Sequence, residues 1–214
     1  MDSIQTQVDT YLQKLLELQY RVSEPITHKP TKGDLRENFI HRMVLEQFPN
    51  LILKKGILCS KDWQSTQADF LWLKDNARIG NLNMYDLNDC KLFMEIKSCA
   101  TAAELQAIEN TAEMLKARCS YERFIHIGML CYSTTAKEQT ILKKLGFWYD
   151  KEIQGYSSYR PNLDKMKHVD FLYSLNIQKD DSLATPYFVI RDYWGSCTLY
   201  KDNPVIQYFL RLFK

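Results

Sequence analysis

The sequence predicts an α/β sandwich in which a central mixed β-sheet is flanked by helices. Three observations predict this fold. Segments with apolar residues at helical spacing are interleaved with short apolar runs that suit strands. Residues 124–132 are almost all apolar, which is typical of a central strand covered on both faces. The chain has only 7 Gly and 6 Pro and no internal repeat, so no linker or domain boundary is expected.

Two helices are expected to precede the first strand. Residues 3–22 place apolar side chains at helical spacing, which predicts an amphipathic helix that packs on the body of the protein or on a neighbouring subunit. Pro25 and Pro30 bound an extended polar connection. A second helix is then expected to begin near Thr31–Asp34, which resembles a capping box, and to end at Pro49.

Glu37 lies on this second helix, along the flank of its apolar stripe. A carboxylate in that position points toward the body of the protein, where it is available to a site. The alternative is an ordinary helix charge that pairs with Arg36 or with the surroundings of His41.

The remaining elements follow in order. Thr101–Glu104 form a capping box that predicts a helix, and Ser133–Thr135 are expected to cap another helix that ends at Gly146. A polar loop is expected over residues 74–91, and Pro204 is expected to start a closing amphipathic helix. The expected strand segments are 51–53, 56–59 (after a turn at Lys54–Lys55), 68–73, 92–98, 124–132, 171–175, 187–190 and 197–200.

Composition limits the possible classes of function. The net charge of +2 is nearly neutral, so a polyanion site would have to be a local patch or be built with a metal ion. The six cysteines form no C-x-x-C pair and the four histidines no H-E-x-x-H motif, which disfavours zinc and fits reduced thiols. No leader segment or long apolar run is found, so we expect a cytoplasmic protein without membrane contact. The 13% aromatic content suits a well-filled core and an oligomer interface.

The strand segment Leu92–Ser98 carries two charges that a core strand does not need for packing. Strand alternation places Glu95 and Lys97 on one face and apolar residues on the other. Burying a carboxylate and an ammonium is costly unless they are paired, bind a metal or face a cleft. An isolated Glu-x-Lys pattern favours an ordinary ion pair on an edge strand. The preceding strand, however, also carries a lone acid, Asp69.

Glu37, Asp69, Glu95 and Lys97 form a set that suits metal-dependent hydrolysis of a phosphodiester. Carboxylates are ligands that Mg²⁺ prefers, and the ion polarises a phosphate and lowers the pKa of a bound water. We expect Asp69, Glu95 and Glu37 to bind the ion, and Lys97 to orient or deprotonate the attacking water. Gln67 is expected either to support this site or to make only a loop hydrogen bond.

The order of these residues resembles the signature of the PD-(D/E)XK nuclease superfamily. Asp69 matches its first acid and Glu95-Ile96-Lys97 its E-x-K element, although Ala68 stands where a proline is often found. Residues 30–115 are most similar to the NucC-like effector nucleases of bacterial anti-phage defence. That similarity is carried by Lys32-Gly33-Asp34-x-x-Glu37, Phe48-Pro49, Ser65-x-Gln67-x-Asp69 and Glu95-x-Lys97-Ser98.

The resemblance implies a restriction-endonuclease-like sandwich in a single domain. That domain would span residues 1–214, with an N-terminal helix at 3–22, a catalytic core at about 30–148 and C-terminal strands and a helix at about 168–214. The catalytic residues would be Asp69, Glu95 and Lys97.

The implied activity is that of a Mg²⁺-dependent endonuclease on double-stranded DNA, with Mn²⁺ as a substitute. NucC-like enzymes are trimers that bind a cyclic tri-adenylate, so the resemblance implies a cyclic oligonucleotide activator and a homo-oligomer built on a dimer or a trimer. The sequence itself offers no match to an activator pocket. A stand-alone restriction-type endonuclease, a non-catalytic nucleic-acid-binding or scaffold protein with the same fold, and a metal-free α/β domain remain alternatives.

Overall fold

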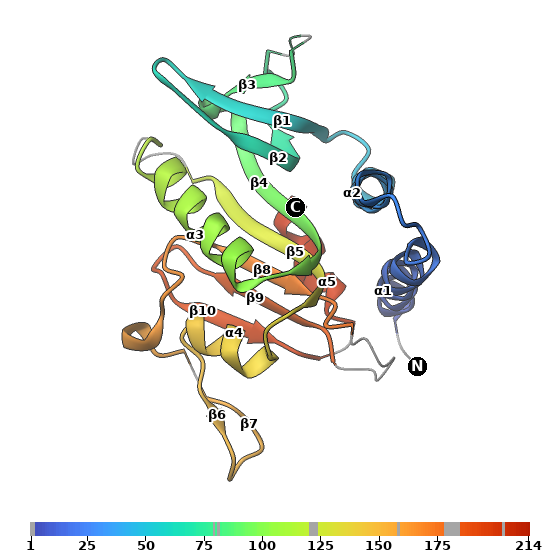
Figure 1. The fold of residues 1–214 in the computed structure, drawn as a ribbon, viewed down its shortest axis with the longest axis vertical. Coiled ribbons are helices and arrows are strands. Elements are labelled where there is room, and N and C mark those ends of the chain that lie inside the picture. The colour runs from blue at the N-terminus through green and yellow to red at the C-terminus, as the bar shows by residue number, and fades with distance from the viewer. Residues whose placement is uncertain are drawn as a thin grey trace.

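The computed structural model describes residues 3–78, 80, 82–119, 124–157, 159–177, 185–202 and 204–214. Within these residues, eight strands form one mixed sheet in the order β10-β9-β8-β5-β4-β2-β1-β3 (Figure 1). Strand β5 lies parallel to β4 and β8, and β1 lies parallel to β3, whereas the other neighbours are antiparallel. The strands are β1 (Ile52–Ser60), β2 (Trp63–Leu73), β3 (Met84–Asp86), β4 (Cys90–Ala100), β5 (His126–Thr134), β8 (Phe171–Ser174), β9 (Tyr187–Arg191) and β10 (Cys197–Tyr200).

Helices cover both faces of this sheet (Figure 1). One face carries α1 (Ile4–Ser23), α2 (Lys29–Gln47) and α5 (Ile206–Leu210), and the other carries α3 (Ala102–Lys116) and α4 (Glu138–Lys144). A small hairpin of β6 (Tyr149–Asp150) and β7 (Gly155–Tyr156) projects beyond the sheet. Short 3₁₀ turns lie at Leu87–Asp89, Pro161–Leu163 and Arg211–Phe213. Among the described residues, every helix is too short or too polar to span a bilayer.

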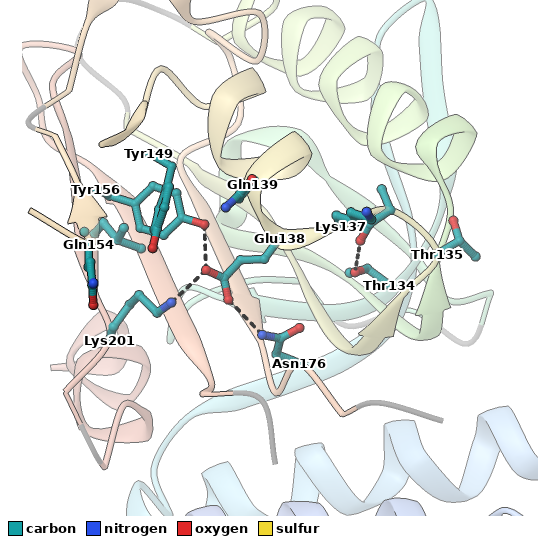
Figure 2. Close-up of a pocket in the computed structure, with 13 residues that line it drawn as sticks. Thr134, Thr135, Lys137, Glu138, Gln139, Tyr149, Gln154, Tyr156, Asn176 and Lys201 are labelled. Atoms are coloured by element: carbon teal, nitrogen blue, oxygen red, sulfur yellow. Dashed lines mark hydrogen bonds and ion pairs between the residues drawn. The ribbon is translucent and has the colours of Figure 1, made fainter. Parts of the chain in front are cut away.

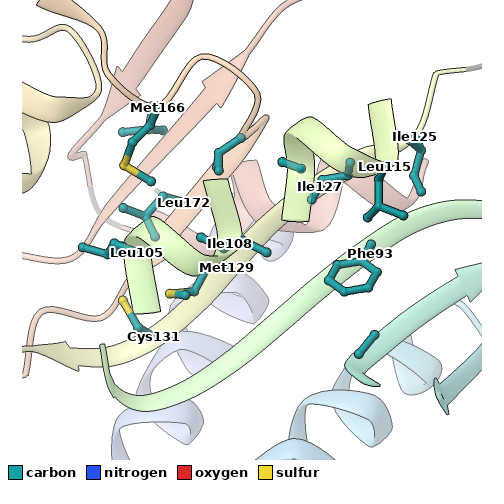
Figure 3. Packing of buried hydrophobic residues seen from close by; sticks show 14 of the residues in the cluster. Phe93, Leu105, Ile108, Leu115, Ile125, Ile127, Met129, Cys131, Met166 and Leu172 are labelled. Atoms are coloured by element: carbon teal, nitrogen blue, oxygen red, sulfur yellow. The ribbon is translucent and has the colours of Figure 1, made fainter. Parts of the chain in front are cut away.

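Each face of the sheet builds its own hydrophobic core. Alternate residues of strand β4 enter different cores, because successive side chains of a strand point to opposite faces. Phe93 belongs to the core with α3 and α4, whereas Met94 and Ile96 belong to the core with α1, α2 and α5. The core under α3 is drawn in Figure 3, where Leu105 and Ile108 of the helix face Met129 of β5. Burial of each such side chain contributes about 1.5–3 kcal/mol, so the central strands are held from both sides.

A buried arginine fixes α2 against α1. Arg36 is 1% exposed; its Nε donates to Ser23 Oγ at 2.8 Å and its Nη2 donates to Glu24 Oε1 at 2.7 Å. Nη1 has no hydrogen-bond partner among the described residues, but the guanidinium also lies over the Tyr20 ring of α1, 4.3 Å from its centroid. Arg36 therefore pairs with α1 and is not the partner of Glu37.

The second helix starts earlier than the sequence suggested. α2 begins at Lys29, and its first turn is capped by the His28 side chain, which accepts from the Thr31 N–H. Pro30 lies in that first turn, where its fixed φ and missing N–H are tolerated. The expected extended connection up to Pro30 and the helix start near Thr31–Asp34 were therefore wrong.

Other boundaries also differ from expectation. β2 begins at Trp63 rather than at residue 68, so Gln67 lies on this strand and not in a loop. β1 is continuous, because the expected turn at Lys54–Lys55 is a bulge in its ladder with β2. α4 begins at Glu138, since β5 continues through the residues Ser133–Thr134 that were expected to cap the helix. The expected loop over 74–91 contains β3 and a 3₁₀ turn, and its residues 79 and 81 lie outside the described residues.

Candidate active site

Asp69, Glu95 and Lys97 meet between β2 and β4. The Lys97 ammonium donates to Glu95 Oε2 at 2.6 Å and to Asp69 Oδ2 at 3.0 Å. The side chains are half-buried, with exposed fractions of 17% for Asp69, 15% for Glu95 and 27% for Lys97. The structure thus brings together three of the residues that the sequence singled out. Their assigned roles stay a prediction.

The strand ladder explains this arrangement. β2 and β4 pair in antiparallel register up to Phe70 opposite Met94, and the pairing stops there. Beyond that point the Asp69 carboxylate, rather than a backbone carbonyl, accepts the Ile96 N–H at 2.9 Å. Glu95 and Lys97 are two residues apart on β4, so alternation turns both toward this carboxylate.

Glu37 lies close to this group but is held by another lysine. Its Oε2 accepts from the Lys55 ammonium of β1 at 2.7 Å, and Lys55 also lies 3.7 Å from Asp34. Burial raises the pKa of Glu37 and the nearby Asp69 charge raises it further, whereas Lys55 opposes the rise. Lys55 is therefore part of a half-buried ion pair next to the site.

His41 also contacts the site, and the sequence interpretation missed it. Its Nε2 lies 3.0 Å from the main-chain carbonyl oxygen of Asp69, and its ring packs on Phe70 with 4.5 Å between centroids. Burial lowers the pKa of His41, so the neutral ring is favoured. Its position four residues after Glu37, on the same helix face, is the one signal in the sequence that links it to the site.

The site holds more negative charge than its environment compensates. Burial raises the pKa of Glu95 to about 7, the Asp69 charge adds to the rise, and Lys97 opposes it. Burial alone would lower the pKa of Lys97, but Glu95 and Asp69 raise it above its ordinary range. Protonating Glu95 or adding a cation would relieve the repulsion between the two carboxylates.

A divalent cation fits this donor set. Mg²⁺ commonly binds one or two protein carboxylates and completes its shell with water and substrate phosphate. No group of three or more His, Cys, Asp or Glu side chains in the described part of the chain is arranged to hold an ion alone. The charged groups around the site nevertheless have a formal excess of two negative charges, which one divalent cation would neutralise. Two ammonium groups, those of Lys55 and Lys97, face four carboxylates, those of Asp34, Glu37, Asp69 and Glu95.

Glu95 and Lys97 line a small cavity beneath α3. Its volume is about 230 Å³, and Glu95, Lys97 and the exposed Gln67 contribute to its wall. Glu104 of α3 also lines it, but its Oε2 accepts from the Thr101 N–H and hydroxyl and so serves the helix cap. The structure therefore places Gln67 in the same cavity wall as Glu95 and Lys97.

A larger cavity, of about 810 Å³, lies elsewhere, between α4, the β6–β7 hairpin and β10 (Figure 2). Its one carboxylate, Glu138, accepts from Tyr156 Oη at 2.7 Å, Lys201 Nζ at 2.7 Å and Asn176 Nδ2 at 2.9 Å. A carboxylate with three donors is satisfied and has little tendency to bind a cation. The smaller site with uncompensated charge is therefore the better candidate for chemistry.

Comparisons with known proteins bear on the fold. No protein-family model matches the chain, and no curated protein sequence matches it. The cAAA-bound NucC of P. aeruginosa ATCC27853 superimposes with a TM-score of 0.69 at 13% identity, over 99% of this chain and 91% of that chain. NucC of E. coli MS115-1 gives 0.61 at 13% identity in its apo form, over 98% and 89% of the chains. Its cAAA-bound form gives 0.57 at 12% identity, over 78% and 88%. The chain therefore has a NucC-like α/β nuclease fold, as its sequence resemblance predicted.

Proposed function

We propose that the protein is a Mg²⁺-dependent endonuclease that hydrolyses phosphodiester bonds of double-stranded DNA, with Mn²⁺ as a substitute. The observation that supports this proposal best is the contact of the Lys97 ammonium with both Asp69 and Glu95 in a half-buried site. In a NucC-like fold, such a trio has the groups that phosphodiester hydrolysis needs.

Asp69 and Glu95 are the proposed ligands of the cation, and Glu37 is the proposed third acid. When bound, the ion polarises the scissile phosphate and lowers the pKa of its water. The Ile96 N–H holds Asp69 Oδ2 and leaves the second oxygen of that carboxylate for binding. Glu37 would first have to exchange its contact with Lys55.

Lys97 is the proposed partner of the reacting phosphate. Its raised pKa supports a protonated ammonium at neutral pH, which donates hydrogen bonds and stabilises negative charge that develops on the phosphate. This favours orientation of the attacking water and charge stabilisation over the role of a base.

We further propose activation by a cyclic oligonucleotide, assembly as a homo-oligomer and a cytoplasmic role in anti-phage defence. Activation by a cyclic oligonucleotide is supported by two of the similar structures, which are cAAA-bound forms of NucC. A stand-alone endonuclease of the restriction type is the alternative. The two differ in one respect that can be measured, because the stand-alone enzyme needs no activator.

Nicking of supercoiled plasmid tests the proposal. The protein is incubated with Mg²⁺, Mn²⁺ or chelator, with and without a panel of cyclic oligonucleotides. We expect metal-dependent cleavage that is lost in Glu95→Gln and Lys97→Met. Lys91→Met is the matched control, because Lys91 lies on the same strand, six residues and about 20 Å from Lys97, and its ammonium packs over the Trp72 ring. Full activity in Glu95→Gln, or no cleavage under any of these conditions, would contradict the proposal.

A further inference from the structure

Asp69 lies where both of its strand ladders are interrupted. On one side, the pairing of β2 with β4 ends at Phe70. On the other side, the ladder with β1 passes from Lys54–Leu71 to Gly56–Ala68 across a bulge, which leaves Asp69 without a paired residue. Regular sheet hydrogen bonds therefore do not fix the main chain at this acid.

Two contacts that are not part of the regular ladders hold Asp69 instead. The His41 ring reaches the Asp69 main-chain carbonyl from α2, with 3.0 Å between Nε2 and the oxygen. The Asp69 carboxylate in turn accepts the Ile96 N–H of β4 at 2.9 Å. The first contact holds the backbone, and the second holds the side chain together with the Lys97 ammonium, which donates to the same Oδ2 at 3.0 Å. These contacts determine where the free carboxylate oxygen points.

The His41 ring is itself held in place. It packs on Phe70, the residue next to Asp69, and the ring centroids are 4.5 Å apart. Because a carbonyl oxygen only accepts, the hydrogen bond requires the proton on Nε2. The helix below is anchored through Arg36 to α1, so the imidazole approaches from a fixed element.

We propose that His41 is a positioning residue for Asp69: its Nε2–H donates to the Asp69 carbonyl and holds this acid in the geometry that binds the divalent cation. The inference rests on the proposed function for the identity of the bound group. It goes beyond that proposal in assigning a role to a residue that touches neither the phosphate nor the ion. Partners that orient metal ligands in this way commonly alter metal affinity about 10- to 100-fold when they are removed.

Two substitutions at position 41 separate the donor from the packing. His41→Gln places an amide N–H near the position of Nε2, whereas His41→Leu keeps apolar volume against Phe70 and removes the donor. His126→Leu is the matched control, since His126 is also a partly buried histidine but lies on β5 at a distance from the acids. Thermal melts verify that each variant folds.

The first readout needs neither metal nor activity. Amide hydrogen exchange at Ile96, followed by NMR in the metal-free protein, should be about 10-fold faster in His41→Leu and close to wild type in His41→Gln and His126→Leu. The second readout is Mn²⁺ affinity by calorimetry, which should fall about 10-fold or more in His41→Leu and recover in His41→Gln. In nicking assays the loss should appear in kcat rather than in the KM for DNA.

The outcomes distinguish this inference from the proposed function. Unchanged Ile96 exchange in a folded His41→Leu protein would overturn the role of His41, as would equal losses in His41→Leu and His41→Gln. If the wild type binds Mn²⁺ and shows the predicted exchange pattern but cuts no DNA, the endonuclease proposal fails and the role of His41 stands.

Discussion

Glu95→Gln should stabilise the metal-free protein while it abolishes cleavage. In the folded state, burial and the Asp69 charge raise the pKa of Glu95 from 4.5 to about 7. A raised carboxyl pKa means that the folded protein keeps a proton which the unfolded chain releases. The stability that this proton contributes is therefore complete below about pH 4.5 and is lost as the pH rises through about 7.

The size of the effect follows from the pKa difference. A rise in the pKa of Glu95 from 4.5 to about 7 corresponds to about 3 kcal/mol in the free energy of unfolding. The wild type has lost this stabilisation at pH 8, because Glu95 is then ionised, whereas the neutral glutamine keeps it. In a chain of 214 residues, about 3 kcal/mol corresponds to a rise in Tm of about 6–12 °C. The glutamine also preserves the side-chain volume, so no cavity is introduced.

Thermal and urea unfolding in chelator between pH 5 and pH 8 measure this difference. The difference in stability between Glu95→Gln and wild type should increase with pH. Added Mg²⁺ should stabilise the wild type more than the variant. Glu113→Gln serves as the control, because Glu113 is exposed on α3 and its charge can be removed without changing the site. A gap that is absent at pH 8, or that does not change with pH, would refute the account of Glu95 as a repelled, half-buried carboxylate.

Three further substitutions test the surroundings of the site and of the sheet. Gly128→Ala should lower the free energy of unfolding, measured in urea, by about 3 kcal/mol or more, because a Cβ at this position of β5 would lie 2.2 Å from a carbonyl oxygen of β8. Arg191→Met should cost about 3–5 kcal/mol in the same measurement, since it leaves the buried Asp164 carboxylate without its cation, now 2.8 Å away. Lys55→Met should lower stability at pH 8 by about 1–2 kcal/mol and Lys55→Arg by less, because Glu37 loses its 2.7 Å partner at a half-buried position. Equal stability of Lys55→Met and Lys55→Arg would show that this ion pair contributes nothing.

The sequence was most informative where a local rule decides the structure. Alternation along β4 correctly separated Glu95 and Lys97 from Met94 and Ile96, because a strand has a period of two whatever surrounds it. The capping box at Thr101 was found for the same reason, since its two hydrogen bonds join residues only three apart. These features need no knowledge of the rest of the fold.

Features that depend on long-range contacts could not be found in this way. The His41–Asp69 hydrogen bond joins residues 28 positions apart, and the Lys55–Glu37 ion pair joins β1 to α2. The direction of the Lys55 side chain depends on a bulge in β1, which the sequence suggested was a turn. A pattern within one segment does not contain this information, so the neighbours of the site became visible only in the assembled sheet.

The interrupted ladder gives a physical reason for the geometry of the site. If the register of Phe70 with Met94 continued by one step, Asp69 would lie directly opposite Glu95. Like charges that face each other across two strands lie about 5 Å apart and destabilise the pair. By leaving the ladder, Asp69 instead turns its carboxylate to the Ile96 N–H and to Lys97, which reduces the repulsion without removing it. Burial and the remaining repulsion from Asp69 raise the pKa of Glu95, and the proposed divalent cation would offset that repulsion. A site built for stability alone would have continued the ladder and used an apolar residue at position 69.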